Sequence, residues 1–598
     1  VMLIFTYNFP NNCIFTASKL SARMERPTVF LLILILTISE AYAQPFVNIS
    51  SGLPGIGRGA VAFADFDNDN DLDLILAGQD NTYSPFAAVY RNDAGQFVAV
   101  ESGISALENC AMAVSDYDLD GLPDVVITGV DFDGSKTLLY RNTGNFLFGL
   151  VPAGFYNPGA GGDLAWADYN HDGYPDLVIS GNWQTHLYTN NGDGTFSPDE
   201  AGLVGMNTPA LAWGDFDNDG DPDLLMAGDA GLVAEVYIYM NQEGVFTRLE
   251  TQIEGAVGGD ARWGDADNDG YLDILITGKD VSLMPVSYVY RNNGDNTFSF
   301  ANAGLVGTAL GPADWIDYDN DGDLDIMIAG QNAGCGNAAT RLYENNGAGS
   351  FNEFPAGLSY AERAASAWGD FDNDGDSDLV LTGISTGHTT RFYRNDLLSG
   401  NFQPNTPPSV PGNLYTYVSG NYAVISWARS TDAQSPQNSI TYNVMMGSSP
   451  GSIDVISPLS DPATGNRSIP ATGNTGQNDF MIFRDLEPGT YYFRVQAIDQ
   501  AYAGSAFSDE GSFEVLSTPA AHQPLQVPEL MLQHGIIMVN FLPVSGGEAY
   551  LVGSEGRIYE ARHFAGNNLE FSFRNLTSGL YVIRVLAEGK QWTWKFVK

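Results

Sequence analysis

Seven short acidic segments hold the side chains of this 598-residue chain whose types and spacing could do chemistry. Each segment reads D-x-[DN]-x-D-[GN]-x-x-D, so oxygen-bearing side chains stand at positions 1, 3, 5 and 9. Ca²⁺ takes about 6–8 oxygen ligands at ~2.3–2.6 Å, and alternate residues of a tight turn can direct their oxygens at one point. We therefore predict up to seven structural Ca²⁺ ions. The predicted metal ligands are Asp65, Asp67, Asp69 and Asp73; Asp116, Asp118, Asp120 and Asp124; Asp168, Asn170, Asp172 and Asp176; Asp215, Asp217, Asp219 and Asp223; Asp265, Asp267, Asp269 and Asp273; Asp317, Asp319, Asp321 and Asp325; and Asp370, Asp372, Asp374 and Asp378.

The pattern favours a Ca²⁺ site in a β-hairpin loop over three alternatives, which are an EF-hand, a Mg²⁺ site and an acidic turn without metal. An EF-hand needs a bidentate Glu at position 12 and flanking helices. Position 12 is apolar here, from Leu76 in the first segment to Leu381 in the last. Mg²⁺ prefers fewer protein ligands and more water. Solvated acidic turns without metal are the remaining alternative, but carboxylates ~4 Å apart would repel by about 1–4 kcal/mol per pair. Because catalytic carboxylates would not be needed seven times over, we predict no catalytic residue among them.

The acidic segments recur at intervals of 47–53 residues, a period typical of propellers, solenoids and repeat arrays. A second pattern, Tyr-x-Asn followed by Gly and Phe, recurs in register from Tyr90-x-Asn92 to Tyr393-x-Asn395 and predicts a β-hairpin. Each repeat then supplies four short strands, A to D, with the acidic segment between A and B. Seven such repeats predict an all-β fold, a seven-bladed β-propeller over residues 44–404. The segment Phe46-Val47 is similar to a D strand without its repeat, so we expect it to complete the last blade.

These repeats resemble the FG-GAP (VCBS-like) repeats of integrin α-subunit propellers and of many secreted bacterial proteins, over roughly residues 46–403. The resemblance implies a β-propeller with Ca²⁺ in the A–B loops, ligated through positions 1, 3, 5 and 9 and the position-7 carbonyl. It also implies that these ions are mainly structural.

Strand parity places the B–C and D–A loops on the face opposite the acidic segments, and these loops vary in sequence, as ligand-contacting loops do. Trp183, Tyr83 and His388 fall in predicted B–C loops and are our candidate ligand residues. An exposed aromatic side chain there could stack on a sugar ring. Ordinary loop packing is the alternative for each of the three.

The chain carries 72 Asp and Glu against 26 Lys and Arg, a net charge of −46. This excess argues against nucleic acid and anionic membranes as partners, since both require basic patches. Residues 1–43 predict a secretory signal peptide with its true start at Met24, because an apolar run and an Ala41-Tyr-Ala site follow that Met. No later run is long and apolar enough to predict a transmembrane segment. We therefore expect a secreted protein, extracellular or on the outer-membrane surface.

The remainder of the sequence predicts two further all-β units. Residues 405–413 are Pro-rich and predict a linker. Residues 414–516 contain Trp427 and the run Leu486-Glu-Pro-Gly-Thr-Tyr-Tyr-Phe-Arg-Val, and they resemble a fibronectin type III domain, which implies a β-sandwich. Residues 525–598 contain Gly579-Leu-Tyr-Val-Ile-Arg-Val before a basic terminus, and they resemble the small C-terminal β-sandwich that sorts proteins in the bacterial type IX secretion system. That resemblance implies the type IX machinery as a partner, removal of this domain and attachment to the cell surface.

From these features we predict a calcium-binding propeller that acts in adhesion, binding an extracellular glycan or protein through its B–C and D–A loops. One alternative is an extracellular polysaccharide-degrading enzyme that uses the face opposite the calcium loops. No Ser/His/Asp arrangement, zinc motif or off-register acid pair supports catalysis, so we predict that the chain is not an enzyme. The other alternative is a structural surface spacer without a specific ligand.

Overall fold

The computed structural model describes residues 46–516, apart from short gaps at 50–51, 70, 232, 243, 334–337, 375, 397–404, 420, 459, 461, 466, 468–469 and 484–485, together with seven strands between 529 and 597. The predicted signal peptide and the start at Met24 lie outside the described residues. The chain divides into two compact units, Val1–Ser517 and Thr518–Lys598. Among the described residues the fold is all-β, and its one helical element is the 3₁₀ turn η1 (Gln437–Ser439).

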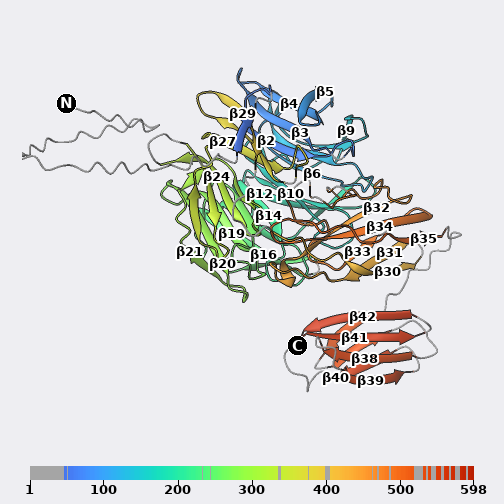
Figure 1. Cartoon of the computed structure of the whole chain (residues 1–598). Helices are drawn as coiled ribbons and strands as arrows, with labels where there is room; N and C mark the ends of the chain where they lie inside the picture. The colour runs from blue at the N-terminus through green and yellow to red at the C-terminus, as the bar shows by residue number, and fades with distance from the viewer. Residues whose placement is uncertain are drawn as a thin grey trace, which may run out of the picture. The chain divides into compact units, whose positions relative to one another are not determined.

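Antiparallel four-stranded sheets, here called blades 1 to 7, follow one another along residues 46–395 (Figure 1). Blades 1 to 3 consist of β2 (Ile56–Ala64), β3 (Asp73–Asp80), β4 (Pro85–Asp93) and β5 (Gln96–Val100); β6 (Glu108–Ser115), β7 (Asp124–Asp131), β8 (Gly134–Asn142) and β9 (Phe148–Val151); and β10 (Asp163–Ala167), β11 (Asp176–Gly181), β12 (Gln184–Asn190) and β13 (Phe196–Asp199).

The later blades repeat this order. Blades 4 to 6 consist of β14 (Asn207–Gly214), β15 (Asp223–Asp229), β16 (Ala234–Gln242) and β17 (Val245–Leu249); β18 (Ala261–Gly264), β19 (Asp273–Lys279), β20 (Pro285–Asn292) and β21 (Phe298–Ala301); and β23 (Ala313–Ile316), β24 (Asp325–Asn332), β25 (Ala339–Asn345) and β26 (Phe351–Phe354). The short strand β22 (Thr308–Ala309) pairs with both β20 and β24 and so joins blades 5 and 6 into one sheet. Blade 7 contains β27 (Glu362–Gly369), β28 (Asp378–Ile384) and β29 (His388–Asn395).

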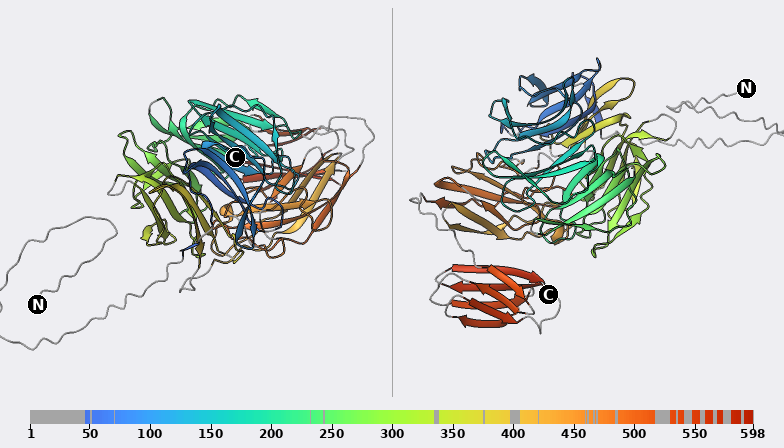
Figure 2. Two further views of the ribbon diagram at one scale, coloured as in Figure 1. Left: turned by 90° about the horizontal axis from the view of Figure 1, so that it is seen from above. Right: turned by 180° about the vertical axis from the view of Figure 1, so that it is seen from behind.

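The N-terminal strand β1 (Phe46–Ile49) supplies the fourth strand of blade 7, pairing antiparallel with β29 so that Phe46 lies opposite Asn395. This confirms the prediction that the segment at Phe46 completes the last blade. The first strand of each of blades 1 to 5 contacts the first strand of the next blade, β24 of blade 6 contacts β27 of blade 7, and β27 contacts β2 of blade 1 (Figure 2). The blades therefore form a closed ring, which is the architecture of a β-propeller and leaves no unpaired sheet between first and last repeat.

Aromatic side chains between neighbouring blades hold the ring together. Trp263 stacks on Phe216 of the preceding blade, with ring centroids 5.6 Å apart and planes 4° apart. Trp166 on Tyr117 and Trp213 on Tyr169 repeat this arrangement. A Cβ atom on Gly264 would lie only 2.6 Å from the Trp315 ring, so only Gly allows the next blade to approach this closely. The regular spacing of these Trp residues therefore reflects packing between blades.

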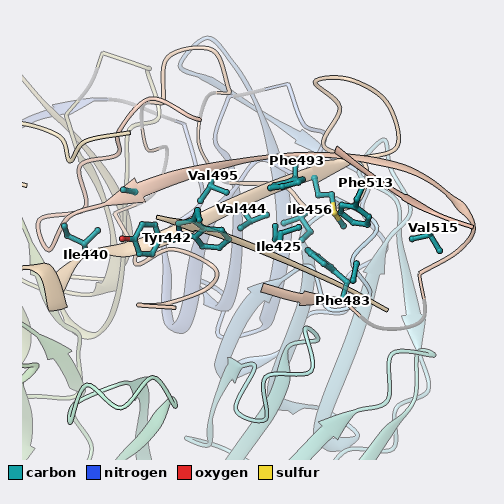
Figure 3. Close-up of a cluster of buried hydrophobic side chains, with 14 residues drawn as sticks. Ile425, Ile440, Tyr442, Val444, Ile456, Phe483, Phe493, Val495, Phe513 and Val515 are labelled. Carbon is teal, nitrogen blue, oxygen red and sulfur yellow. The ribbon is translucent and has the colours of Figure 1, made fainter. Parts of the chain in front are cut away.

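Two three-stranded sheets face each other after the propeller. One contains β30 (Gly412–Ser419), β31 (Tyr422–Ala428) and β33 (Phe480–Phe483), and the other contains β32 (Thr441–Gly447), β34 (Gly489–Ile498) and β35 (Gly511–Val515). Their buried side chains form one core that includes Trp427 and Tyr442 (Figure 3). The Tyr442 hydroxyl accepts a 2.8 Å hydrogen bond from the Ser430 backbone. This is a β-sandwich, and its first strand begins two residues before the predicted boundary at residue 414.

The C-terminal unit also consists of antiparallel sheets. One sheet contains β36 (Glu529–Gln533), β37 (Ile536–Asn540) and β40 (Asn568–Ser572). The other has the order β39 (Ile558–Phe564), β38 (Gly547–Gly553), β41 (Leu580–Ala587) and β42 (Lys590–Val597). In the part of the chain that the structure describes, no helix is long and apolar enough to cross a membrane.

Candidate metal centres

The seven acidic segments form the A–B loops, and hydrogen bonds between neighbouring loops place them together on one face of the ring. The residue at position 4 of every loop has a left-handed φ between 55° and 61°. Its side chain reaches the next loop in several blades: Asn68 Nδ2 donates to the Gly121 carbonyl at 2.8 Å, and Asn373 Nδ2 donates to Asp71 Oδ1 at 2.7 Å across the junction of blades 7 and 1. Position 4 was not singled out by the sequence, although five of its seven residues are Asn, which tolerates this φ.

Carboxylates converge inside these loops. In at least four loops, oxygens from positions 1, 3 and 9 lie within 4.8 Å of one another, and in loop 5 oxygens from positions 1, 3 and 5 do so. The four groups are Asp65, Asp67 and Asp73; Asp116, Asp118 and Asp124; Asp215, Asp217 and Asp223; and Asp317, Asp319 and Asp325, and the fifth-loop group is Asp265, Asp267 and Asp269. The structure thus brings the predicted ligands at positions 1, 3 and 9 together in loops 1, 2, 4 and 6 and those at positions 1, 3 and 5 together in loop 5, and each group could hold a metal ion.

The position-1 carboxylate also shapes the turn. Its Oδ1 accepts the backbone N–H of position 5 in all seven loops, as in the 3.0 Å bond from Asp69 to Asp65. In loops 2 to 6 its Oδ2 accepts the N–H of the Gly at position 6, at 2.9–3.0 Å. The Gly at position 6 is left-handed in these loops, for example with φ 100° at Gly220. These bonds close the loop around the point where the side chains converge.

The position-9 carboxylate is tied to the Asn of the Tyr-x-Asn pattern. Its Oδ1 accepts the backbone N–H of that Asn in every blade, at 2.7–2.9 Å. The Asn side chain then donates to the position-2 carbonyl of the preceding loop, at 2.7–2.8 Å, so that seven such bonds run around the ring. The seven residues, called the Asn clasps below, are Asn92, Asn142, Asn190, Asn241, Asn292, Asn345 and Asn395. The sequence showed their periodicity but not this role.

The carboxylates at position 3 show whether a cation would fit in the loops. In five loops its Oδ1 atom is buried without a hydrogen-bond partner, at Asp67, Asp118, Asp267, Asp319 and Asp372. A buried carboxylate oxygen without a partner is costly, and a bound cation is one of the few groups that relieves this cost. Three of these oxygens, on Asp67, Asp118 and Asp319, lie in loops where the position-1 and position-9 oxygens converge on position 3, and in loop 5 the position-1 and position-5 oxygens converge on Asp267. The donor set therefore suits a hard cation that prefers oxygen ligands.

The loops differ in the charge beside position 3. In loop 2, Arg141 contacts Asp118 at 2.6 Å and Asp120 at 2.7 Å. In loop 5, Arg291 contacts Asp267 at 3.0 Å. The equivalent residue in blade 6 is Glu344, which raises the pKa of Asp319 further. Loop 6 therefore presents the most concentrated negative charge to a cation.

Burial raises the pKa of many loop carboxylates. It raises the pKa of Asp73 to about 8 and that of Asp223 to about 9, although each accepts two backbone hydrogen bonds that act in the opposite direction. Burial, followed by the charges of Asp219 and Asp217, raises the pKa of Asp215 to about 7. Without a cation, the folded propeller therefore favours protonated carboxyl groups near neutral pH.

These shifts predict an unusual pH dependence for the metal-free protein. A group whose pKa is higher when folded stabilises the fold below its unfolded pKa, and this contribution is lost as pH rises through the folded pKa. We expect the melting temperature in EDTA to fall as the pH is raised from about 4 to about 9. In Ca²⁺ the gain over EDTA should grow over the same range, because the cation competes with protons. Thermal denaturation followed by circular dichroism checks both slopes, and a metal-free protein that becomes more stable with rising pH would contradict the prediction.

The β-sandwich meets the same face as the acidic loops. Ser439 Oγ donates to Asp265 Oδ2 at 2.7 Å, and Asn478 Nδ2 donates to the Gly220 carbonyl at 3.2 Å. Leu119, at position 4 of loop 2, packs against the hydrophobic core of the sandwich. The Asp-loop face is thus occupied over part of its extent, a contact between distant segments that the sequence did not predict.

The three candidate ligand residues occupy different environments. Tyr83 is strongly exposed at the hairpin between β3 and β4, and its ring meets that of His388 at 5.4 Å between centroids. His388 itself is buried as the first residue of β29, where burial lowers the pKa of its imidazole. Trp183 is half-exposed at the β11–β12 hairpin of blade 3. The structure therefore brings Tyr83 and His388 together and places Trp183 on another blade.

Comparison with known proteins supports the repeat assignment. A model of the FG-GAP-like repeat matches the chain five times, over residues 116–179, 168–226, 215–276, 265–328 and 317–381. Residues 116–381 carry FG-GAP-like repeats. Each match begins at the first Asp of one acidic loop and ends in the strand after the next loop. The predicted resemblance is confirmed over this range, while blade 1 lies outside the matched residues. No curated protein matches the chain.

Several solved structures are similar at low sequence identity. The extracellular domain of the putative hybrid two-component system BT3049 from B. thetaiotaomicron is 11% identical, with a TM-score of 0.38; the match covers 78% of this chain and 57% of that one. The corresponding domain of BT4673 from the same organism is 10% identical, with a TM-score of 0.35 and coverage of 79% and 59%. A mutant of Aleuria aurantia lectin, in complex with alpha-methyl-L-fucoside, is 11% identical, with a TM-score of 0.32 and coverage of 51% and 99%. This chain thus spans less than two thirds of the two extracellular domains.

Proposed function

We propose that this chain is a secreted, non-catalytic binding module for adhesion, in which Ca²⁺ rigidifies a propeller that presents its B–C and D–A loops to an extracellular glycan or protein. The observation that carries this proposal is the division between the two faces. The Asp-loop face holds converging carboxylates and the contacts with the sandwich. The opposite face keeps exposed side chains such as Tyr83 and Trp183. A rigid scaffold with variable loops on one face is a common design for binding.

The proposed metal ligands are the carboxylates at positions 1, 3 and 9, with position 5 completing the set where it converges. Bound Ca²⁺ would supply positive charge for oxygens that otherwise repel, and it would have no role in catalysis. The support comes from the orphaned position-3 oxygens, such as Asp67 Oδ1 and Asp372 Oδ1. The FG-GAP-like repeats over residues 116–381 share the same loop pattern.

The flanking segments complete the proposal. The signal peptide over residues 1–43 would direct export, and the fibronectin type III-like sandwich would serve as a spacer. Residues 525–598 would act as a sorting domain for the type IX machinery and lead to an extracellular or outer-membrane location. Support for these roles comes from the sequence resemblances and from the all-β folds of both later units.

An array of soluble glycans and extracellular matrix proteins, probed with the full chain in Ca²⁺, tests the binding function. We expect a selective signal that falls in the Trp183→Ala variant. Phe300→Ala is the matched control, because Phe300 is an exposed aromatic residue on β21, away from the hairpin tips. Silence of the folded chain across the array would favour the spacer alternative, and release of shortened oligosaccharides would favour the enzyme.

A further inference from the structure

Five consecutive blades carry an exposed large apolar side chain at the hairpin between their second and third strands. These side chains, called the apolar tips, are Tyr83, Phe132, Trp183, Val233 and Leu283, with exposed fractions of 74%, 87%, 48%, 47% and 72%. Antiparallel order puts all five hairpins on the face opposite the acidic loops. Single exposed apolar residues are ordinary, but their recurrence at one position of successive repeats indicates an interaction surface.

Hydrogen bonds within the hairpins fix the apolar tips of blades 1 and 5 in the same way. The backbone N–H of Tyr83 donates to the Asp80 carbonyl, and that of Leu283 donates to the Asp280 carbonyl, both at 2.9 Å. Each Asp side chain also accepts backbone N–H groups of its own turn, including that of Ser84 in blade 1 and that of Met284 in blade 5. The tips are therefore held in place before any partner arrives, which lowers the entropy cost of binding.

Backbone conformation at the tips is unfavourable for the residues found there. Tyr83 and Leu283 have φ values of 61° and 63°, a region that bulky residues rarely adopt. In blade 3, Asn182 and Trp183 form a two-residue hairpin with φ values of 49° and 57°. Asn-Gly is the favoured pair for such a turn, yet Trp takes the position of Gly. Large side chains in strained positions of this kind are typical of functional sites.

The chemistry of the tips distinguishes a protein partner from a sugar. Aromatic rings stack on sugars, but Val233 and Leu283 occupy equivalent hairpins and have no ring. A mixture of aromatic and aliphatic anchors is typical of the core of a protein interface. Acidic residues flank the tips: Asp80 and Asp280 begin their turns, and Asp133 beside Phe132 has a side chain that is 88% exposed and lies 3.8 Å from Lys136 Nζ. Two copies of the chain would repel each other across such a surface, since each carries a net charge of −46.

We infer that the apolar tips dock a partner protein whose surface combines apolar side chains with Lys or Arg. This inference rests on the proposed binding function and names the class of its ligand. The partner's apolar groups cover the tips, and its cations face Asp80 and Asp280. Complementary charge of this kind speeds association and weakens with salt.

Defined peptides test the partner class with the full chain in Ca²⁺. Fluorescence anisotropy compares a peptide of alternating Leu and Lys with one of alternating Ser and Lys and one of alternating Leu and Glu. We expect the Leu/Lys peptide to bind at least about tenfold more tightly than the other two. In the variant with Tyr83→Ser, Phe132→Ser, Trp183→Ser and Leu283→Ser, this preference should disappear. The control variant carries Leu150→Ser, Val245→Ser and Phe300→Ser, which remove exposed apolar side chains elsewhere on the propeller and should leave the preference unchanged.

Each contrary result has a distinct meaning. Equal affinity for the Leu/Lys and Ser/Lys peptides would overturn the inference, because attraction would then be purely electrostatic. If the tip variant still prefers the Leu/Lys peptide, the binding site does not lie at the apolar tips. Oligosaccharide binding that is lost in the tip variant, without peptide binding, would overturn the partner class and leave the proposed binding function standing. Dimerisation of the chain that the tip variant abolishes would replace the partner by a second copy.

Discussion

The melting temperature of the full chain should rise by about 10–20 °C when EDTA is replaced by millimolar Ca²⁺ at pH 8. Each site that fills to 100 times its Kd contributes about 2.7 kcal/mol to the free energy of unfolding, and several sites act together. The physical cause is the set of buried, orphaned oxygens such as Asp67 Oδ1 and Asp267 Oδ1. Differential scanning calorimetry with Ca²⁺, Mg²⁺ and EDTA provides the measurement. An unchanged midpoint in Ca²⁺ would show that the loops do not need the ion.

Asp319→Asn tests the same prediction at a single site, because the shift in melting temperature that it causes should have opposite signs in EDTA and in Ca²⁺. Both oxygens of Asp319 are buried without a hydrogen-bond partner, and burial together with Asp321 and Glu344 raises its pKa to about 7. At pH 8 the side chain is mostly ionised. In EDTA the variant should melt above the unmodified chain, since it removes a buried charge. In Ca²⁺ it should melt below it, since it removes a ligand. Asp133→Asn, at an exposed hairpin, is the matched control and should shift neither midpoint.

Periodic features could be predicted from the sequence. The repeated Asp pattern located all seven A–B loops, and the unmatched segment at Phe46 correctly indicated how the ring closes. The Trp residues before the loops recur with the same period, and they pack between blades, as Trp263 on Phe216 shows. These predictions succeeded because each depends on a pattern within one repeat or on counting repeats.

Contacts between repeats could not be predicted in the same way. The Asn clasps follow from which carbonyl of the neighbouring loop lies within reach, and nothing in one repeat specifies that geometry. His388 was assigned to a loop, but it begins β29 and is buried, because reciprocal bonds with Asn81 of blade 1 hold its backbone. The contact of Ser439 with Asp265 spans 174 residues. Such pairings depend on the tertiary arrangement, so the candidate metal loops were predictable and their supports were not.

The same contacts explain why metal and ring should stabilise each other. The position-9 Asp accepts the N–H of the Asn clasp, and the clasp donates to the preceding loop. A cation that holds the position-9 carboxylate therefore also holds the strand that reaches the neighbouring blade. Loop and ring thus form one connected set of hydrogen bonds. The set is repeated seven times, and the bond from Asn92 to the Phe371 carbonyl closes the ring between blades 1 and 7.

Replacement of one Asn clasp should destabilise the propeller far more than replacement of its neighbour. Asn190 is buried, and its Nδ2 donates to the Tyr117 carbonyl at 2.8 Å and to the Pro175 carbonyl at 3.1 Å, while its Oδ1 accepts the Gly192 N–H. Asn190→Ala leaves these groups buried without partners, so we expect a loss of about 2–4 kcal/mol in the free energy of unfolding.

Asn191→Ala is the matched control for this prediction. Asn191 is the same residue type one position further on, and its side chain is exposed and bonded to Thr195 Oγ1. Its replacement should change the free energy of unfolding by no more than about 0.5 kcal/mol. Urea denaturation in Ca²⁺ compares the two variants. The clasp joins blades 2 and 3, and Asp176 of loop 3 accepts the Asn190 N–H. Asn190→Ala should therefore also reduce the rise in melting temperature that added Ca²⁺ produces. Equal effects of the two substitutions would show that the ring is held by aromatic packing between blades, with the clasps contributing little.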